Sequence, residues 1–457
     1  MRILESRSPW TLAAVAAVGL VFSGCNPREE LLEPQNPGLV DPSAVNSADA
    51  ADALRIGALG SLRNVTAGSE SLWMYGGLLT DEWKSSDTFL QRNETDQRTI
   101  QTNNGNINTA YNSIQQSRGF IRDGIEQMVK FLPDAKGNIG ELYFALGFVE
   151  MQMAEDFCNG IPLGLARNGV IDYSDPNYKP LTNAEVYVKA AAHLDSAIAL
   201  AGAQTDAHSV AVKQAALVAR ARVYIDQAKF AEAAALVPAS AVPTSYQYLL
   251  SFAQTSGDNQ IWSFNTNQGR YTVADSFDAS GVIKNALPFI SAKDPRVPVT
   301  DAKKKGFDGQ TNLFNFTIAR SDPSPLVSGI DARLIEAEAK LKANDIAGMM
   351  TILNALRTSA QTIGSIKVPV MAALPTPASQ DAAITLFFRE KGFWTFSRGQ
   401  RLGDERRLVR QYNRTQDQVF PVGAFHKNGN YGSDVNLPVT DTEKTNPNFK
   451  GCLDRNA

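Results

Sequence analysis

Small and large residues alternate at helical spacing in two separate parts of this chain, and this pattern constrains the fold more than any other feature. In residues 216–224, alanines alternate with larger residues up to Tyr224, and Phe230 follows across a short turn. Small residues let a neighbouring helix approach closely, while the aromatic ring fills the gap between the two helices. The pattern returns in residues 337–349. We therefore expect a mainly α fold of tetratricopeptide-like helix pairs forming a scaffold, with an irregular loop-rich lobe and a few short strands.

A capping box begins one of these helices. Thr182 and Glu185 are spaced so that the hydroxyl and the carboxylate each accept a hydrogen bond from a backbone N–H that the first helical turn leaves unpaired. Apolar residues then recur on one face at the 3.6-residue period, and Gly202 stands where a helix would stop. The sequence predicts helices over residues 182–202, 209–227 and 229–237.

Two stretches, residues 68–106 and 240–325, lack this helical periodicity. Both contain aromatic residues among many amides, hydroxyls and acids, which indicates long irregular insertions in the scaffold. Within the second stretch, residues 260–264 alternate between apolar and polar, which predicts a strand that buries Trp262 in the core.

Aromatic rings in such polar loops suit sugar recognition. A flat ring stacks on the C–H groups of a pyranose, and side-chain amides bond its hydroxyls. We expect Trp83 to be the chief stacking residue of a ligand site, opposed by Tyr271 from the other irregular stretch. Polar contacts would come from the loop that follows Trp83, through Asp87, Arg92 and Asn93. The alternative is that these rings only pin long loops to the scaffold.

The N-terminus has the parts of a secretory signal. Basic residues precede an apolar stretch that is too short to span a bilayer comfortably, and small residues lead to Cys25. The sequence Val-Phe-Ser-Gly-Cys resembles a lipobox, so we expect a signal peptide at 1–24 and lipidation of Cys25, which would attach the chain to a membrane surface. Residues 25–45 are rich in proline and charge and predict a tether leading into a folded domain at 46–457.

Two further cysteines, Cys158 and Cys452, remain once Cys25 is assigned to lipid. An even remainder in an exported chain usually pairs, so we expect a disulfide between them. It would fasten a C-terminal tail that is otherwise a loose segment. The alternative is two free, buried thiols.

The sequence contains no motif that predicts catalysis. There is no nucleophile elbow, phosphate-binding loop or dinucleotide fingerprint. No metal-ligand spacing exists among the three histidines, which are His193, His208 and His426. Asp81 and Glu82 could pose as a glycosidase pair, but adjacent acids are more often surface charge. We therefore expect no enzyme, no metal and no cofactor.

Charge patterning indicates structure more than ligand binding. The net charge of −3 argues against a nucleic-acid partner, because no basic excess exists to neutralise phosphates. Residues 389–410 contain six arginines among three acids, and we expect bidentate arginine–carboxylate pairs there that lock a helix and a loop together, in preference to an anion site. The basic run at 303–305 predicts a solvated loop.

Several segments resemble, in order, the signatures of the SusD/RagB family of outer-membrane nutrient-binding lipoproteins. The segments are 141–163, a helix ending in a Pro-Leu turn, 294–296 (Asp-Pro-Arg), 333–339, 388–407, 420–421 (Phe-Pro) and 446–448 (Asn-Pro-Asn). The resemblance covers roughly residues 25–452. The helix that reads Arg-Phe-Leu-Arg-Ala in the family lacks its arginines here. The family's usual Tyr-Gly-Asp-Val-Pro is replaced by Phe-Cys-Asn-Gly-Ile-Pro at 157–162. These departures indicate a divergent branch.

The resemblance implies helix pairs beside an irregular lobe. It also implies a lipid-anchored outer-membrane protein, facing the cell exterior, that binds an oligosaccharide or a peptide and delivers it to a TonB-dependent transporter. The alternative, from another class, is a tetratricopeptide-type envelope scaffold lipoprotein without a small-molecule ligand.

Overall fold

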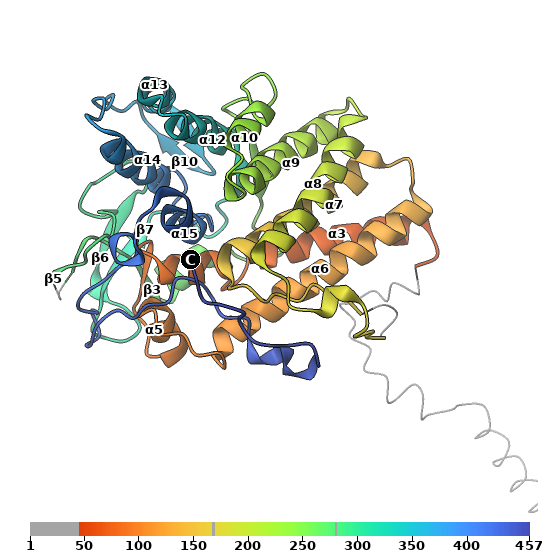
Figure 1. The fold of residues 1–457 in the computed structure, drawn as a ribbon, viewed down its shortest axis with the longest axis horizontal. Coiled ribbons are helices and arrows are strands. Elements are labelled where there is room, and N and C mark those ends of the chain that lie inside the picture. Colours follow the sequence, from red (N-terminus) through yellow and green to blue (C-terminus); the bar gives the residue numbers. More distant parts are fainter. Residues whose placement is uncertain (1–44, 167–169, 279–280) are drawn as a thin grey trace, which may run out of the picture. The chain divides into compact units, whose positions relative to one another are not determined.

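The computed structural model describes residues 45–166, 170–278 and 281–457. The predicted signal peptide, the lipidation site Cys25 and nearly all of the predicted tether therefore lie outside the described residues. Asn46–Ala457 form one unit, and Figure 1 follows it from α3 (Ala48–Asn64) to the C-terminal end. In this part of the chain, no helix combines the length and the apolar character needed to cross a bilayer.

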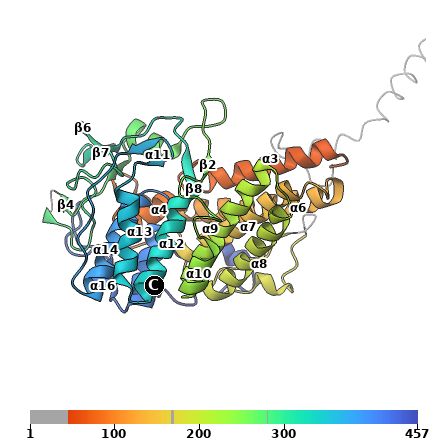
Figure 2. The ribbon, with the colours of Figure 1, turned by 90° about the horizontal axis from the view of Figure 1, so that it is seen from above.

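Helices are the main secondary structure in the described ranges, as predicted. The longer ones after α3 are α6 (Gly105–Phe131), α7 (Lys136–Asp156), α8 (Asn183–Gly202), α9 (Ala207–Asp226), α12 (Gly329–Lys342), α13 (Ile346–Arg357), α14 (Gln380–Trp394) and α15 (Arg401–Tyr412). The shorter ones are α4 (Leu72–Leu79), α5 (Leu90–Asp96), α10 (Phe230–Leu236), α11 (Gln260–Trp262) and α16 (Gln416–Val419), with 3-10 turns η2 (Pro176–Tyr178) and η4 (Asp441–Thr445). Figure 2 shows the helices side by side, with α7 packed on α8, α8 on α9 and α12 on α13. The predicted scaffold of helix pairs is confirmed.

Local sequence signals set the helix ends. The Thr182 N–H donates to the Glu185 carboxylate at 2.7 Å and the Glu185 N–H donates to the Thr182 hydroxyl at 3.3 Å, so the capping box of α8 is present. The next helix begins at Ala207, two residues before the predicted start, because Asp206 accepts a hydrogen bond from the Ser209 N–H at 3.0 Å.

The second helix pair carries its own hydrophobic core. A left-handed residue, Asn344 (φ 60°), ends α12 and lets α13 turn back against it. Apolar residues from α12, α13 and α14 then interdigitate, among them Leu334, Leu341, Met349, Leu353 and Phe387. Burial of this shared face holds the three helices together.

The strands are short and form five two-stranded sheets in the described ranges. The paired strands are β1 (Trp83–Ser85) with β3 (Tyr271–Val273), β2 (Gln247–Leu250) with β8 (Ser324–Ser328), β4 (Phe277–Asp278) with β5 (Gly281–Val282), β6 (Val299–Lys305) with β7 (Asn312–Phe316), and β9 (Gln361–Ile363) with β10 (Ile366–Val368). The β1–β3 pair is antiparallel, with Trp83 opposite Val273 and Ser85 opposite Tyr271. It joins the two irregular stretches, which lie far apart in the sequence.

The predicted strand at residues 260–264 is wrong. This segment is helical, with α11 continuing into the π-helical turn η3 (Ser263–Asn267). The Asn259 side chain accepts a hydrogen bond from the Ile261 N–H at 3.0 Å and so starts a helical turn. Trp262 is half-buried. Five alternating residues are too short a pattern to outweigh this cap.

The arginine-rich block does lock separate elements together. Arg398 pairs with Asp331 of α12 at 2.6 Å, and Arg401 pairs with Asp81 at 2.6 Å. Arg407 bonds Asp404 at 2.5 Å. All these side chains are buried, so the structural interpretation of the block is confirmed.

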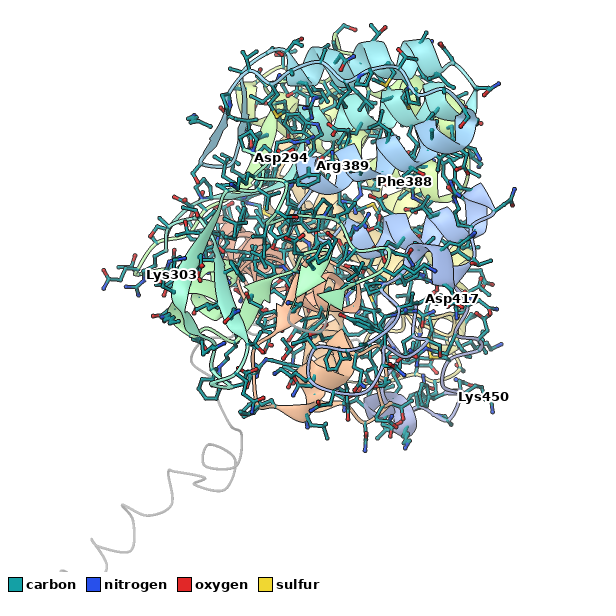
Figure 3. The ribbon with its side chains drawn as sticks, turned by 90° about the vertical axis from the view of Figure 1, so that its left-hand side faces the viewer. Asp294, Lys303, Phe388, Arg389, Asp417 and Lys450 are labelled. Atoms are coloured by element: carbon teal, nitrogen blue, oxygen red, sulfur yellow. A yellow bond between two sulfur atoms is a disulfide. The ribbon has the colours of Figure 1, made fainter. Side chains whose placement is uncertain are left out.

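The Asp-Pro-Arg segment belongs to the same locking system. Arg296 is buried and bonds both Asp294 (2.6 Å) and Glu390 of α14 (2.7 Å), and Figure 3 shows Asp294 near Arg389 on that helix. By contrast, Lys303 projects from the β6–β7 hairpin with its side chain 82% exposed, although it lies in a strand and not in the predicted loop.

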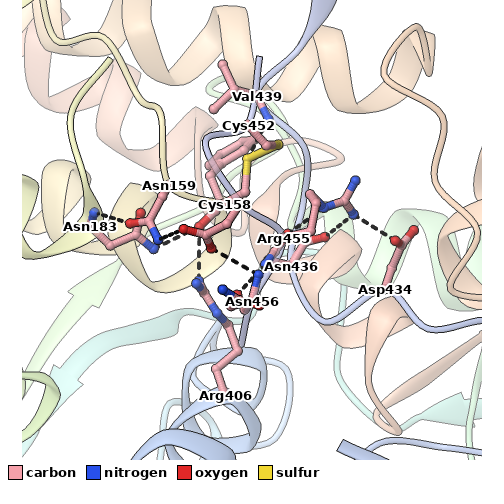
Figure 4. The surroundings of a disulfide bond; sticks show 12 residues. Cys158, Asn159, Asn183, Arg406, Asp434, Asn436, Val439, Cys452, Arg455 and Asn456 are labelled. Atoms are coloured by element: carbon pink, nitrogen blue, oxygen red, sulfur yellow. Dashed lines mark hydrogen bonds and ion pairs between the residues drawn. A yellow bond between two sulfur atoms is a disulfide. The ribbon is translucent and has the colours of Figure 1, made fainter. Parts of the chain in front are cut away.

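A disulfide fastens the C-terminal segment. Cys158 and Cys452 are bonded, with Cα atoms 5.7 Å apart, and this is the pair expected from the sequence (Figure 4). Hydrogen bonds continue the attachment on both sides, because the Asn159 amide donates to Asp454 at 2.9 Å and the Arg455 guanidinium pairs with Asp434 at 2.9 Å. The tail is therefore held by several contacts beyond the disulfide.

Candidate functional site

Asp87 organises the loop between β1 and α5. One carboxylate oxygen accepts hydrogen bonds from the backbone N–H groups of Thr88 and Phe89, at 2.6 and 3.1 Å. The other accepts from the guanidinium groups of Arg92 and Arg270, both at 2.8 Å. The buried carboxylate therefore ties the loop, α5 and the segment before β3 to one point.

Two phenylalanine rings lie against one of these arginines, Arg270. The Arg270 guanidinium lies 5.2 Å from the centre of the Phe89 ring and 4.0 Å from the centre of the Phe307 ring. The rings are 49% and 50% exposed, so each presents apolar surface to solvent. We call Phe89, Arg270 and Phe307 the aromatic surface. The guanidinium against which both rings lie is itself anchored by Asp87.

The turn that carries Phe307 is fixed by a close backbone approach. The Phe307 N–H donates to the Gly269 carbonyl at 2.8 Å, and the Asp308 N–H donates to the Ser86 carbonyl at 2.9 Å. A Cβ added at Gly306 would lie 2.4 Å from the Ser86 Cβ and 2.8 Å from the Gly269 oxygen. Only glycine fits there, and this contact brings the β6–β7 turn against the β1–α5 loop.

Every charge that supports the aromatic surface has an opposite partner. Arg270 pairs with Asp87, and Lys427 pairs with Asp308 at 2.8 Å. Burial opposes ionisation of Asp87, but hydrogen bonds from Arg270 and the Phe89 N–H outweigh it and lower the pKa of that carboxyl. Burial is likewise outweighed at Asp308, where Lys427 and neighbouring hydrogen bonds lower the pKa to about 2. Both carboxylates therefore stay ionised at neutral pH, and each lies against a basic side chain.

Glu70 supports the site from behind. Its carboxylate accepts hydrogen bonds from two nitrogens of the Arg92 guanidinium, one of them at 2.5 Å. It also accepts a hydrogen bond from the Tyr271 hydroxyl at 2.6 Å. Asn93 is half-buried and accepts hydrogen bonds from Ser85 at 2.7 Å and from Lys427 at 3.1 Å. These residues hold the loop in shape.

The structure does not place Trp83 or Tyr271 where a ligand could stack on them, which corrects the expectation from the sequence. Both side chains are 0% exposed. The Trp83 ring packs 5.2 Å from that of Phe396 and edge-on to Tyr271 at 6.4 Å. The β1–β3 pairing turns both rings inward, so they are core residues. Asp87, Arg92 and Asn93 are brought together as expected, but they support the surface from beneath.

The exposed rings were not singled out from the sequence. Phe307 stands in a Gly-Phe-Asp-Gly turn, a glycine-flanked context that could have marked an exposed ring at a hairpin tip. Phe89 directly precedes α5, and nothing in the residues near it separates it from Trp83 as a candidate. Arg270 carried no signal, because Asp87 and the two rings against which it lies are far away in the sequence.

Asp81 and Glu82 are neither surface charge nor an accessible acid pair. They are 2% and 0% exposed, and Asp81 is bonded by Arg401 at 2.6 Å. Burial raises the pKa of Glu82 to about 8. No set of three or more His, Cys, Asp or Glu side chains in the described ranges has the arrangement to hold a metal ion.

Comparison with known proteins identifies the fold. No protein-family model and no curated protein matches the sequence. Among solved structures, a laminarin-binding SusD-like protein superposes with a TM-score of 0.64 at 14% identity, covering 90% of this chain and 100% of that one. A SusD-like protein from Bacteroides fragilis gives 0.62 at 12% identity, covering 91% and 98%. A SusD/RagB family protein from Bacteroides thetaiotaomicron gives 0.57 at 14% identity, covering 81% and 89%.

Proposed function

We propose that this chain, which has the SusD-like fold, is an outer-membrane lipoprotein that binds a nutrient oligosaccharide and delivers it to a TonB-dependent transporter. The observation that carries the proposal is the aromatic surface, where the half-exposed rings of Phe89 and Phe307 both lie against the anchored Arg270. The likeness to a laminarin-binding SusD-like protein supports a carbohydrate as the ligand.

The chemistry of the aromatic surface favours a neutral sugar. Exposed rings can stack on the C–H faces of pyranose units, as aromatic side chains do in other sugar sites. The supporting charges are paired, through Arg270 with Asp87 and Lys427 with Asp308, so these groups give the surface no excess charge of either sign. A chain of neutral sugar units meets both conditions better than a charged peptide.

A binding experiment tests this assignment. Laminarin and other neutral glucans are titrated calorimetrically into the purified full chain and into Phe89→Ala and Phe307→Ala variants. Each variant loses a stacking ring and is expected to bind on the order of tenfold more weakly. Phe277→Ala is the matched control, because that ring is 63% exposed on β4. Equal affinities in all four proteins would remove the aromatic surface as the site.

Membrane attachment is tested separately at Cys25. A Cys25→Ala protein is expected to appear in the soluble fraction, because the lipid on that residue would be the anchor. An unmodified thiol at the mature N-terminus, detected by mass spectrometry, would contradict the anchor.

Copurification from detergent-solubilised outer membrane tests the partner. A transporter barrel is expected in the purified complex if the chain delivers a ligand to it. Recovery of periplasmic envelope proteins without such a barrel, together with no glycan binding, would favour the scaffold function instead.

A further inference from the structure

A turn near the C-terminus contacts both loops of the aromatic surface, and we call residues 424–430 the C-terminal turn. Ala424 and Asn430 form an antiparallel bridge that closes it. Asn428 and Gly429 have left-handed backbone conformations, with φ of 79° and 80°. Two consecutive residues of this kind let the chain reverse tightly, as in a β-hairpin. The C-terminal turn is therefore a compact unit whose backbone holds its side chains in fixed positions.

Hydrogen bonds around this turn fasten it to β1 and α5. The Gln97 side chain, just after α5, donates to the Asn430 carbonyl at 3.0 Å, and the Gly432 N–H donates to the Gln97 carbonyl at 2.7 Å. His426 Nε2 lies 3.0 Å from the Ser85 carbonyl oxygen at the end of β1. These contacts place the C-terminal turn against β1 and α5 without any contribution from the exposed rings.

The Lys427 ammonium group joins the two loops that carry the rings. It lies 2.8 Å from the carboxylate of Asp308, which directly follows Phe307 in the β6–β7 turn. It also donates to the side-chain oxygen of Asn93 at 3.1 Å and to the backbone carbonyl of Asp87, in the β1–α5 loop. A single group on the C-terminal turn thus holds the β1–α5 loop and the β6–β7 turn together.

The donors of Lys427 are all used within the protein. An ammonium group has three N–H donors, and the oxygens of Asp308, Asn93 and Asp87 are three acceptors for them. The Lys427 side chain is 16% exposed. It therefore acts on the aromatic surface through the two loops, and not as a contact to the ligand.

We infer that Lys427 is a positioning residue of the proposed sugar site and that the C-terminal turn is the third loop of that site. The inference rests on the proposed function, in which Phe89 and Phe307 stack on one sugar chain. Both rings can do so only if their loops keep a constant spacing, and loops ordered before binding lower its entropic cost. The Asp308 N–H also donates to the Ser86 carbonyl, at 2.9 Å, so loss of the Lys427 contacts is expected to loosen the surface and not to unfold it.

Lys427→Met tests the inference in the full chain, because methionine keeps most of the side-chain volume and removes every donor. Calorimetric titration with laminarin is expected to show binding weakened on the order of tenfold. Hydrogen exchange followed by mass spectrometry is expected to be faster in residues 86–93 and 305–311 and unchanged in α7. A lysine that touched the ligand directly would weaken binding without changing exchange in the ligand-free protein.

A second variant separates positioning from the effect of an unpaired charge. Lys427→Met leaves the Asp308 carboxylate without its ion-pair partner. Asp308→Asn removes that charge, and asparagine can still accept hydrogen bonds from the N–H groups of Gln310 and Thr311, both now at 2.9 Å. The double variant is therefore expected to bind laminarin as weakly as Lys427→Met. Recovery of full affinity in the double variant would overturn the inference.

Lys444→Met is the matched control. Lys444 pairs with Asp441 at 2.7 Å within η4, and its side chain is 65% exposed. This variant is expected to keep the affinity and the exchange rates of the unaltered protein. Unchanged laminarin affinity or unchanged loop exchange in Lys427→Met overturns the inference. If the unaltered protein binds no laminarin, the proposed function fails for this sugar, and loop exchange in Lys427→Met alone decides whether the residue positions the loops.

Discussion

Replacing Glu82 with glutamine is expected to change how the stability of the protein depends on pH. Glu82 is fully buried, and one of its oxygens accepts a hydrogen bond from the Ser397 N–H at 2.9 Å. The other oxygen has no hydrogen-bond partner in the described part of the chain. Burial raises the pKa of the Glu82 carboxyl from 4.5 to about 8. The Ser397 hydrogen bond lowers this pKa, and the nearby charge of Asp81 raises it.

The sign and size of the effect follow from this shift. The folded protein holds a proton on Glu82 up to about pH 8, whereas the unfolded chain releases it near pH 4.5. Its contribution to stability is therefore fully present below pH 4.5 and is lost as the pH rises toward 8. At about 1.4 kcal/mol per pH unit, Glu82 should lower the free energy of unfolding by about 3 kcal/mol between pH 4.5 and neutrality.

Urea unfolding of the two proteins at several pH values measures this effect. Glutamine has the shape of a neutral glutamic acid and does not titrate, so Glu82→Gln should gain stability relative to the unaltered protein as the pH rises. Glu232→Gln, the same change at an exposed position on α10, is the control. Its difference in stability from the unaltered protein should not change with pH. A constant stability difference between Glu82→Gln and the unaltered protein from about pH 5 to about pH 8 would refute the reasoning.

Three further outcomes are expected. Replacing both Cys158 and Cys452 with serine should lower the free energy of unfolding by about 2–5 kcal/mol in denaturant, and reduction of the unaltered protein should match it. Gly306→Ala should lower the free energy of unfolding by about 1–3 kcal/mol and weaken glucan binding, because the new Cβ meets the neighbouring loop. Unchanged glucan binding would show that this turn does not position the Phe307 ring. Arg401→Met should lower the free energy of unfolding by about 3–5 kcal/mol, because it leaves the buried Asp81 without its ion-pair partner. Adding Asp81→Asn should recover part of that stability.

Local sequence alone determined the features whose causes lie within a few residues. The capping box of Thr182 and Glu185 needs only residues three apart, so the start of α8 could be predicted from the sequence. The helix pairs follow from periodic small and large residues, which act through nearest neighbours on the same helix face. The disulfide of Cys158 and Cys452 was predictable for a different reason, because counting cysteines left a single pair.

Only the tertiary structure decided which rings face solvent. Trp83 and Tyr271 are buried because β1 pairs with β3, and that register is set by contacts between segments nearly two hundred residues apart. Phe89 and Phe307 are exposed because Arg270 and the glycine turn hold them at the rim of the same loops. Residue type fixes what a side chain can bind, but its accessibility depends on long-range packing, which no local pattern in the sequence records.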